Sequence, residues 1–219
     1  MIKLVVFDMA GTTVDEQNVV YKTLHKAIDE AGFDISFKEV LRDGAGKEKK
    51  RAIIDILEDF TSENLVVDSI FDRFLVLLDE AYKNLDVIPQ DGAEAIFNYL
   101  KSKDIKVVLN TGYDQATAEL LIQKLNWQLG VHYDLLVTAS QVSKSRPHPD
   151  MIQLAQQTLG IDNPQSVIKI GDSIIDIEEG KNAGCKYNIG ITTGAHTKNN
   201  YNPLNLIISF IIFRNFKPS

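Results

Sequence analysis

The stretch KLVVFDMAGT, residues 3–12, joins a short apolar run to a loop of small and polar residues. Its first half is rich in β-branched side chains, which predicts a buried strand. Asp8 follows that run directly, and Gly11 favours a turn just after it. The stretch therefore predicts a strand that carries the Asp8 carboxylate and the Thr12 hydroxyl at its end.

Three later runs are also short and apolar, and they alternate with segments whose apolar residues have helical spacing. The expected strands are residues 106–110, 135–138 and 167–170, and the expected helices are residues 93–103, 115–125, 149–159 and 174–183. Strands that alternate with helices predict βα units and a parallel sheet. The expected fold class is α/β, with a Rossmann-like core of parallel strands and helices on both faces.

The stretch between the first strand and residue 86 shows helical patterns and no convincing strand. Helices are expected over residues 19–31, from about 44 to 60, and over 63–86. Pro89 and Gly92 then mark a linker. We therefore expect an α/β core formed by residues 1–15 and 90–219, with residues 16–89 inserted as a small helical cap domain.

Composition narrows the classes of partner and location. The chain has 219 residues and a net charge of −7, which argues against a general nucleic-acid binder. The single cysteine, Cys185, excludes an intrachain disulfide, and no signal-peptide pattern is seen, so we expect a cytoplasmic protein. The apolar run LNLIISFIIF, residues 204–213, is much shorter than the roughly 20 residues that span a bilayer. It predicts a core or dimer-facing element, and a homodimer is left open.

Chemically capable side chains cluster just after the expected strands, where parallel α/β sheets bind their ligands. Carboxylates from two strands suit Mg²⁺, which prefers oxygen ligands, and a hydroxyl beside a cation suits phosphate. A carboxylate can also attack phosphorus and form an aspartyl-phosphate. The residues concerned are Asp8 and Thr12, then Asn110, Thr111 and Gly112, then Lys144 and Arg146, and finally Asp172 and Asp176.

Each of these signals also has an ordinary structural interpretation. An Asp after a strand often caps a helix, Thr111-Gly112 is typical of a turn, and Arg146-Pro147 is typical of a surface loop. The order and spacing of all four groups together favour a shared site.

The ordered set resembles the haloacid dehalogenase superfamily of phosphotransferases over nearly the whole core. The resemblance implies a nucleophile at Asp8, a Mg²⁺ site formed by Asp8, Asp172 and Asp176, and phosphate-binding roles for Thr111 and Arg146. Thr12 and Gly112 are further candidates for substrate binding.

Two departures from the common pattern are shared with the phosphonatase branch, typified by phosphonoacetaldehyde hydrolase. Ala10 stands where most members have a second Asp, and Arg146 stands where most have Lys. In that branch the backbone carbonyl at the Ala10 position binds the metal, and a cap lysine forms a Schiff base. Lys47 occupies the place of that lysine, but Lys50 stands where the branch has a histidine.

We therefore expect a Mg²⁺-dependent phosphohydrolase that acts on a small phosphorylated or phosphonate metabolite. The first hypothesis is cleavage of a 2-oxoalkyl phosphonate through a Lys47 Schiff base, because an iminium accepts the electrons of the breaking C–P bond. The alternative is a phosphate-ester phosphatase acting on a phosphoglycolate or sugar phosphate. A non-catalytic core that binds phosphometabolites or a protein is a third hypothesis.

Overall fold

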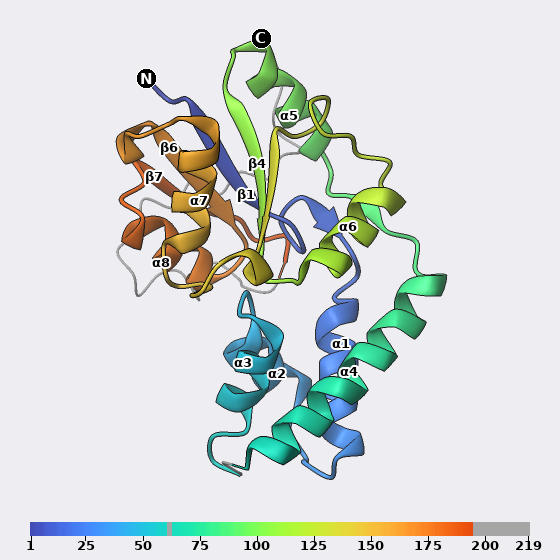
Figure 1. Cartoon of the computed structure of the whole chain (residues 1–219). Helices are drawn as coiled ribbons and strands as arrows, with labels where there is room; N and C mark the ends of the chain where they lie inside the picture. Colours follow the sequence, from blue (N-terminus) through green and yellow to red (C-terminus); the bar gives the residue numbers. More distant parts are fainter. Residues whose placement is uncertain (61–62, 195–219) are drawn as a thin grey trace.

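The computed structural model describes residues 1–60 and 63–194, which form a five-stranded parallel sheet and a helical insertion (Figure 1). The strand order is β5-β4-β1-β6-β7. This arrangement confirms the predicted α/β class. The strands are β1 (Leu4–Asp8), β4 (Lys106–Thr111), β5 (Leu135–Thr138), β6 (Val167–Gly171) and β7 (Tyr187–Gly190).

Strand β1 lies at the centre of the sheet, and this explains its uninterrupted apolar sequence. All five of its residues are buried, because β4 and β6 flank it and helices cover both of its faces. Asp8 pairs in register with Asn110 of β4, and Phe7 pairs with Ile170 of β6. The carboxyl ends of the three strands therefore meet at one edge of the sheet.

Alternate residues of β1 point into two separate hydrophobic clusters. Val5 and Phe7 belong to the cluster that contains Phe97, whose ring meets the Phe7 ring edge-on at 5.4 Å. Leu4 and Val6 belong to the cluster on the other face. The covering helices are α5 (Ala93–Ser102), α6 (Gln115–Lys124), α7 (Asp150–Leu159) and α8 (Ile174–Asn182).

The insertion consists of helices between two short strands, β2 (Val14–Asp15) and β3 (Ile88–Pro89), which pair antiparallel. The helical insertion is thus confirmed, whereas the division into a core of residues 1–15 and 90–219 and a cap of residues 16–89 stays a prediction. We call this insertion the cap below. Its helices are α1 (Val19–Glu30), α2 (Phe37–Gly44), α3 (Lys49–Ile56) and α4 (Asn64–Asn84).

Two local features of the cap differ from the prediction. Helix α2 was not expected, although Ser36 and Glu39 form a reciprocal capping box at its start. The helix expected from residue 44 begins only at Lys49, because Gly46 takes a left-handed conformation with φ of 75° and Glu48 caps α3 with its side chain. The loop that results, residues 45–48, points toward the core.

This loop packs against the core at two glycines. A Cβ atom on Gly46 would lie 2.2 Å from Cγ2 of Ile175, and one on Gly112 would lie 2.8 Å from the carbonyl oxygen of Gly46. A Cβ atom at either position would require neighbouring atoms to shift, and at Gly112 the nearest of these belong to the backbone of the loop. The cap therefore rests on the carboxyl edge of the sheet through a contact that requires glycine.

Two expectations concern the remainder of the chain. Residues 204–213, expected to form a core or dimer-facing element, lie outside the described residues. Within residues 1–60 and 63–194, no helix is both long enough and apolar enough to cross a membrane.

We predict that Gly46→Ala lowers kcat/KM by about tenfold or more, because the cap cannot close over the site. Gly32→Ala is the matched control. Gly32 also has a positive φ, of 90°, but a Cβ atom there would meet no atom within 4 Å. Both substitutions strain the backbone, and only Gly46→Ala obstructs closure. Equal activity of the two variants would show that the loop contact does not control turnover.

Candidate active site

Three buried carboxylates converge at the carboxyl edge of the sheet. Asp8 ends β1, Asp172 follows β6, and Asp176 lies in the first turn of α8. One oxygen from each lies within 4.8 Å of the others. Ser173 caps α8 and donates a hydrogen bond from its hydroxyl to Asp176, which fixes the orientation of that carboxylate. The predicted metal-binding carboxylates are thus brought together.

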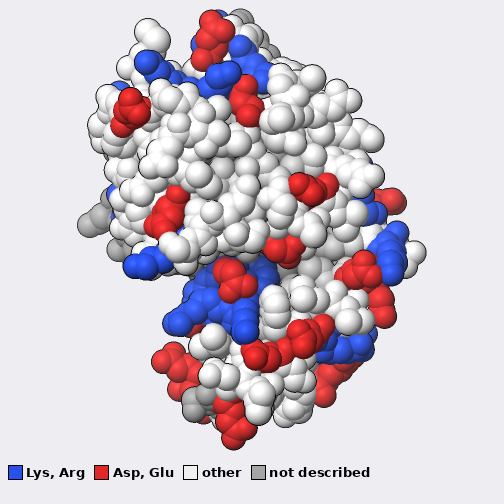
Figure 2. Space-filling model, in the orientation of Figure 1, with Lys and Arg blue, Asp and Glu red and all other residues white. Residues whose placement is uncertain are grey.

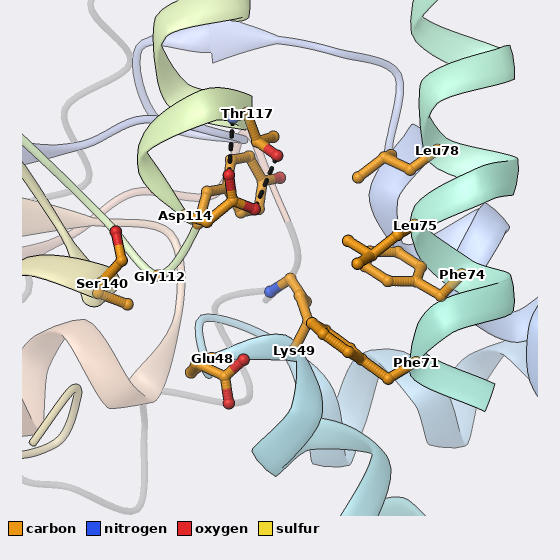
Figure 3. Close-up of a pocket in the computed structure, with 12 residues that line it drawn as sticks. Glu48, Lys49, Phe71, Phe74, Leu75, Leu78, Gly112, Asp114, Thr117 and Ser140 are labelled. Carbon is orange, nitrogen blue, oxygen red and sulfur yellow. Dashed lines mark hydrogen bonds between the residues drawn. The ribbon is translucent and has the colours of Figure 1, made fainter. Parts of the chain in front are cut away.

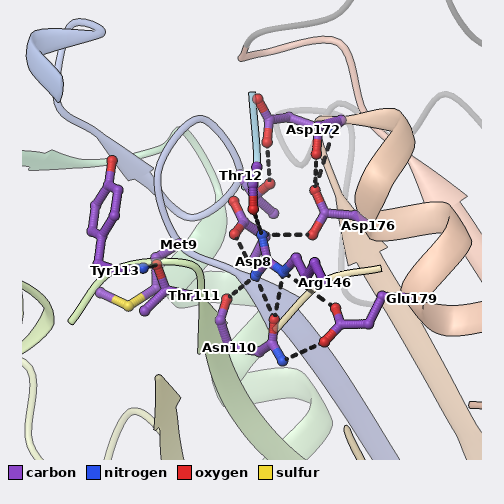
Figure 4. A network of polar contacts seen from close by, with 12 residues as sticks. Asp8, Met9, Thr12, Asn110, Thr111, Tyr113, Arg146, Asp172, Asp176 and Glu179 are labelled. Atoms are coloured by element: carbon purple, nitrogen blue, oxygen red, sulfur yellow. Dashed lines mark hydrogen bonds and ion pairs between the residues drawn. The ribbon is translucent and has the colours of Figure 1, made fainter. Parts of the chain in front are cut away.

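Two buried cations face this cluster, as Figure 4 shows for Arg146. Arg146 Nη2 lies 2.8 Å from Oδ1 of Asp8, and its Nη1 lies 3.1 Å from Oδ1 of Asp176. Lys169 Nζ lies 3.0 Å from the same Asp176 oxygen. Arg146 therefore sits beside Asp8, as expected of a group that would bind phosphate there.

Lys169 and Glu179 were missed by the sequence analysis. Glu179 Oε2 lies 3.3 Å from Arg146 Nε and 3.0 Å from Lys169 Nζ. Asn110 joins the network, because its Oδ1 accepts a hydrogen bond of 2.9 Å from Lys169. Lys169 had a readable signal, a lysine inside the apolar strand VIKIG, whereas Glu179 sits in an ordinary helical pattern.

The balance of charge around Asp8 is negative. The cluster holds two cations, Arg146 and Lys169, and four carboxylates. Burial raises the pKa of Asp8, and the opposing guanidinium of Arg146 does not fully offset it. Burial acts in the same direction on Asp176, but Arg146 and Lys169 outweigh it and lower its pKa.

The donor set fits a divalent cation such as Mg²⁺. Carboxylate oxygens are the ligands that a hard cation prefers, and a double positive charge would neutralise the excess of negative charge. Asp172 also accepts a hydrogen bond of 3.4 Å from the Thr12 hydroxyl. Ala10, expected to offer its carbonyl, lies two residues after Asp8 in a loop that bridges to Val14.

The remaining residues predicted to bind substrate also lie at this edge. Thr111 ends β4 and is 2% exposed, and its hydroxyl accepts a hydrogen bond of 3.2 Å from the backbone nitrogen of Tyr113. Gly112 follows it and contacts the cap loop at Gly46 and Lys47. The structure therefore brings Thr12, Thr111, Gly112 and Arg146 to one region around Asp8.

Lys47 lies on the wall of a wide cavity of about 700 Å³ between cap and core. Figure 2 shows basic side chains gathered where the cap meets the core. The Lys47 ammonium forms an ion pair of 2.6 Å with Asp55, and Asp55 also pairs with Arg51 at 2.7 Å. Lys47 thus lines the cavity that contains Arg146, with its amine held by a cap carboxylate.

Lys49 is more deeply buried than Lys47, and the sequence analysis did not single it out. Its side chain is enclosed, with Nζ 5.0 Å from the ring centre of Tyr21 and 5.2 Å from that of Tyr113. Burial lowers the pKa of Lys49 to about 8. The charge run KEKKR, residues 47–51, could have suggested that one of its lysines faces the core at the start of α3. The run alone does not show which lysine this is.

Lys49 borders a second cavity of about 180 Å³ (Figure 3). In this view it extends between α4 and the loop after β4. The α4 wall is apolar and consists of Phe71, Phe74, Leu75 and Leu78. The opposite wall includes Gly112, Tyr113, Asp114, Thr117, Ala139 and Ser140.

Comparisons with known proteins agree with this geometry. Residues 2–184 match the family model of haloacid dehalogenase-like hydrolases. The chain is 30% identical to the phosphonoacetaldehyde hydrolase of Latilactobacillus sakei, covering 84% of this chain and 73% of that protein. It is 31% identical to the phosphonoacetaldehyde hydrolase of Lactiplantibacillus plantarum, covering 89% and 77%. The fold is also that of a phosphonoacetaldehyde hydrolase like protein from Oleispira antarctica, with a TM-score of 0.77, 22% identity and coverage of 92% and 78%.

We predict that Mg²⁺ raises the thermal midpoint of the wild-type protein, because it relieves the repulsion within the carboxylate cluster. Asp172→Asn should remove most of this increment without lowering the midpoint of the metal-free protein, since it removes one excess negative charge. Asp104→Asn, an exposed change distant from the cluster, is the control and should keep the full increment. Differential scanning calorimetry measures the thermal midpoints of the wild type and of both variants, with and without Mg²⁺. The same increment in Asp172→Asn as in the wild type would contradict the assigned metal site.

Proposed function

The chain belongs to the haloacid dehalogenase-like hydrolases, and we propose that it is a Mg²⁺-dependent phosphohydrolase in which Asp8 attacks phosphorus. The observation that carries this proposal is the buried cluster of Asp8, Asp172 and Asp176 with Arg146 against it. It offers a nucleophile, a set of metal ligands and a cation for the phosphoryl group at one place.

The chemistry at Asp8 proceeds in two steps. An oxygen of Asp8 forms a bond to phosphorus while the bond to the leaving group breaks, which gives an aspartyl-phosphate. Water then attacks that phosphorus, releases phosphate and regenerates the carboxylate. Arg146 neutralises the charge that develops on the phosphoryl oxygens, and Thr111 and Gly112 hold them in place. Mg²⁺ bound by Asp8, Asp172 and Asp176, with the Ala10 carbonyl, would add further positive charge there.

We propose that the bond broken is a C–P bond. Ala10 cannot protonate an oxygen leaving group, whereas a cap lysine can make a carbon leaving group acceptable. The lysine amine condenses with the substrate carbonyl and releases water, and the C–P electrons then move into the iminium to give an enamine. Protonation of the enamine and hydrolysis release the carbonyl product. Lys47 and Lys49 are the cap lysines that line the two cavities at the site.

The apolar wall of the smaller cavity supports this choice. Phe71, Phe74 and Leu78 offer no hydrogen-bond partners for the hydroxyl groups of a sugar. They suit the short organic part of a 2-oxoalkyl phosphonate. The phosphonoacetaldehyde hydrolases similar to this chain point in the same direction.

A phosphate-ester phosphatase is the second candidate, and the wider cavity favours it. Lys47, Arg51 and Lys144 line that cavity beside Arg146. Three cations near the phosphate position suit a substrate with a further negative charge, such as a phosphoglycolate. A sugar phosphate is the other ester to be tested.

We predict that Asp8→Asn lowers turnover by at least about a thousandfold, because an amide cannot take the place of the attacking carboxylate. Release of phosphate is measured with Mg²⁺ on phosphonoacetaldehyde, phosphoglycolate and a panel of sugar phosphates. Asp162→Asn, a change at an exposed position, is the control and should keep full activity.

The substrate panel separates the two candidates. C–P cleavage is supported if borohydride lowers the turnover of the phosphonate and if the esters are hydrolysed slowly. Fast ester hydrolysis that borohydride leaves unchanged supports the phosphatase. If Asp8→Asn retains wild-type turnover on every substrate, Asp8 is not the nucleophile.

A further inference from the structure

A further strand end reaches the carboxylate cluster and has no role in the mechanism above. Strand β7 lies beside β6, with Gly190 paired to Gly171. Past the end of β7, the backbone nitrogen of Ile191 donates a hydrogen bond of 2.9 Å to the carbonyl oxygen of Gly171. Residues 191–194, which we call the β7 loop, therefore leave the sheet beside Asp172, the residue that follows Gly171.

The β7 loop packs its last residue, Gly194, against the Asp172 carboxylate. A Cβ atom on Gly194 would lie 1.9 Å from Oδ2 of Asp172 and 2.5 Å from its Cγ. The absence of a side chain is what allows the backbone to approach so closely. The atoms in the way belong to a side chain, so a methyl group at residue 194 would push the carboxylate aside and leave the sheet in place.

The loop after β1 lies against the same carboxylate. A Cβ atom on Gly11 would be 2.6 Å from Oδ2 of Asp172 and 2.9 Å from Cα of Gly194. The other oxygen, Oδ1, accepts the hydrogen bond of 3.4 Å from Thr12, the residue after Gly11 (Figure 4). The orientation of the Asp172 carboxylate is thus set between the loop after β1 and the β7 loop.

Thr193 ties these two loops together. Its hydroxyl donates a hydrogen bond of 2.6 Å to the carbonyl oxygen of Gly11. The backbone nitrogen of Gly11 donates a hydrogen bond of 2.9 Å to the carbonyl oxygen of Val14. That nitrogen shares a planar peptide group with the Ala10 carbonyl, which is the oxygen expected to bind the metal. The hydrogen bonds on both sides of Gly11 therefore fix the direction of the Ala10 carbonyl as well.

We propose that Thr193 and Gly194 are positioning residues for the metal site. Thr193 holds the turn at Gly11, and Gly194 holds the Asp172 carboxylate in its metal-binding orientation. Both residues act through Asp172 and the loop after β1 and do not bind the metal themselves. The inference rests on the Mg²⁺ site of the proposed function, and it applies whether a C–P or a P–O bond is broken.

The orientation of this carboxylate matters because Mg²⁺ demands near-ideal octahedral geometry from its oxygen ligands. Asp172 lies close to Asp8 and Asp176, and the repulsion between like charges favours rotation of its carboxylate away from them. The contacts with Gly11, Thr12 and the β7 loop oppose that rotation. Loss of a group that holds a metal ligand in place typically weakens metal binding by about 10- to 100-fold.

The test is titration of the metal-free protein with Mg²⁺ alone, followed by isothermal titration calorimetry. In Gly194→Ala the Kd for Mg²⁺ should rise by about tenfold or more, because the added methyl group displaces the Asp172 carboxylate. In Thr193→Val, which keeps the size of the side chain, the Kd should rise by about fivefold, which is the usual effect of one lost hydrogen bond.

Two further variants separate positioning of the metal ligands from a general effect on folding. Thr193→Ser keeps the hydroxyl and should keep the wild-type Kd for Mg²⁺. Thr192→Val makes the same substitution at the neighbouring exposed residue of the β7 loop and should also keep it. A merely structural role for Thr193 would lower the thermal midpoint of metal-free Thr193→Val and leave the Kd for Mg²⁺ in place.

The outcomes separate this inference from the proposed function. An unchanged Kd for Mg²⁺ in either Gly194→Ala or Thr193→Val overturns the inference and leaves the proposed Mg²⁺ site intact. An equal rise of the Kd in Thr193→Ser or Thr192→Val also overturns it, because the hydroxyl of Thr193 is then not the acting group. If Gly194→Ala does not fold, the variants at residues 192 and 193 decide. A wild-type protein that binds no Mg²⁺ overturns both the inference and the proposed function.

Discussion

The excess of buried negative charge at the end of β1 is the constraint on which the site depends. Arg146 and Lys169 face four carboxylates that are buried or nearly so, and burial strengthens each repulsion between them. Such a cluster is unfavourable by itself and becomes favourable when a divalent cation joins it. The repulsion within the cluster therefore lowers the stability of the metal-free protein. The same arrangement holds Asp8 beside the positive charge of Arg146 and of a bound cation.

In the proposed function, the cap completes the chemistry that this cluster cannot perform alone. Ala10 provides no acid or base near Asp8, so in the proposed mechanism the organic half of the substrate is activated from the cap. The loop of residues 45–48 reaches the carboxyl edge of the sheet through glycine contacts, and α3 begins directly after it with Lys49. The contact of the cap with the sheet and the position of Lys49 at the junction are thus both set by the same short segment.

The sheet and the carboxylate cluster could be predicted because their signals are local. A run such as KLVVF is apolar at every position, and the carboxyl ends of parallel strands meet at one edge, so Asp8 and Asp172 could be brought together from the sequence. The orientation of the cap could not be predicted from local signals. Within the charge run at 47–51, burial depends on the loop at Gly46 and on tyrosines from distant segments. Glu16 gave no local signal of its burial, and the hydroxyl that donates a hydrogen bond to it belongs to Tyr82, which lies 66 residues later.

The most direct test of the account is a crystal structure of the protein with Mg²⁺ and vanadate, which imitates phosphorus during transfer. The account predicts vanadium bonded to, or in line with, a carboxylate oxygen of Asp8. It also predicts Arg146 against the vanadate oxygens and the metal between Asp8, Asp172 and Asp176. Vanadate bound elsewhere, with the metal absent from these carboxylates, would contradict it.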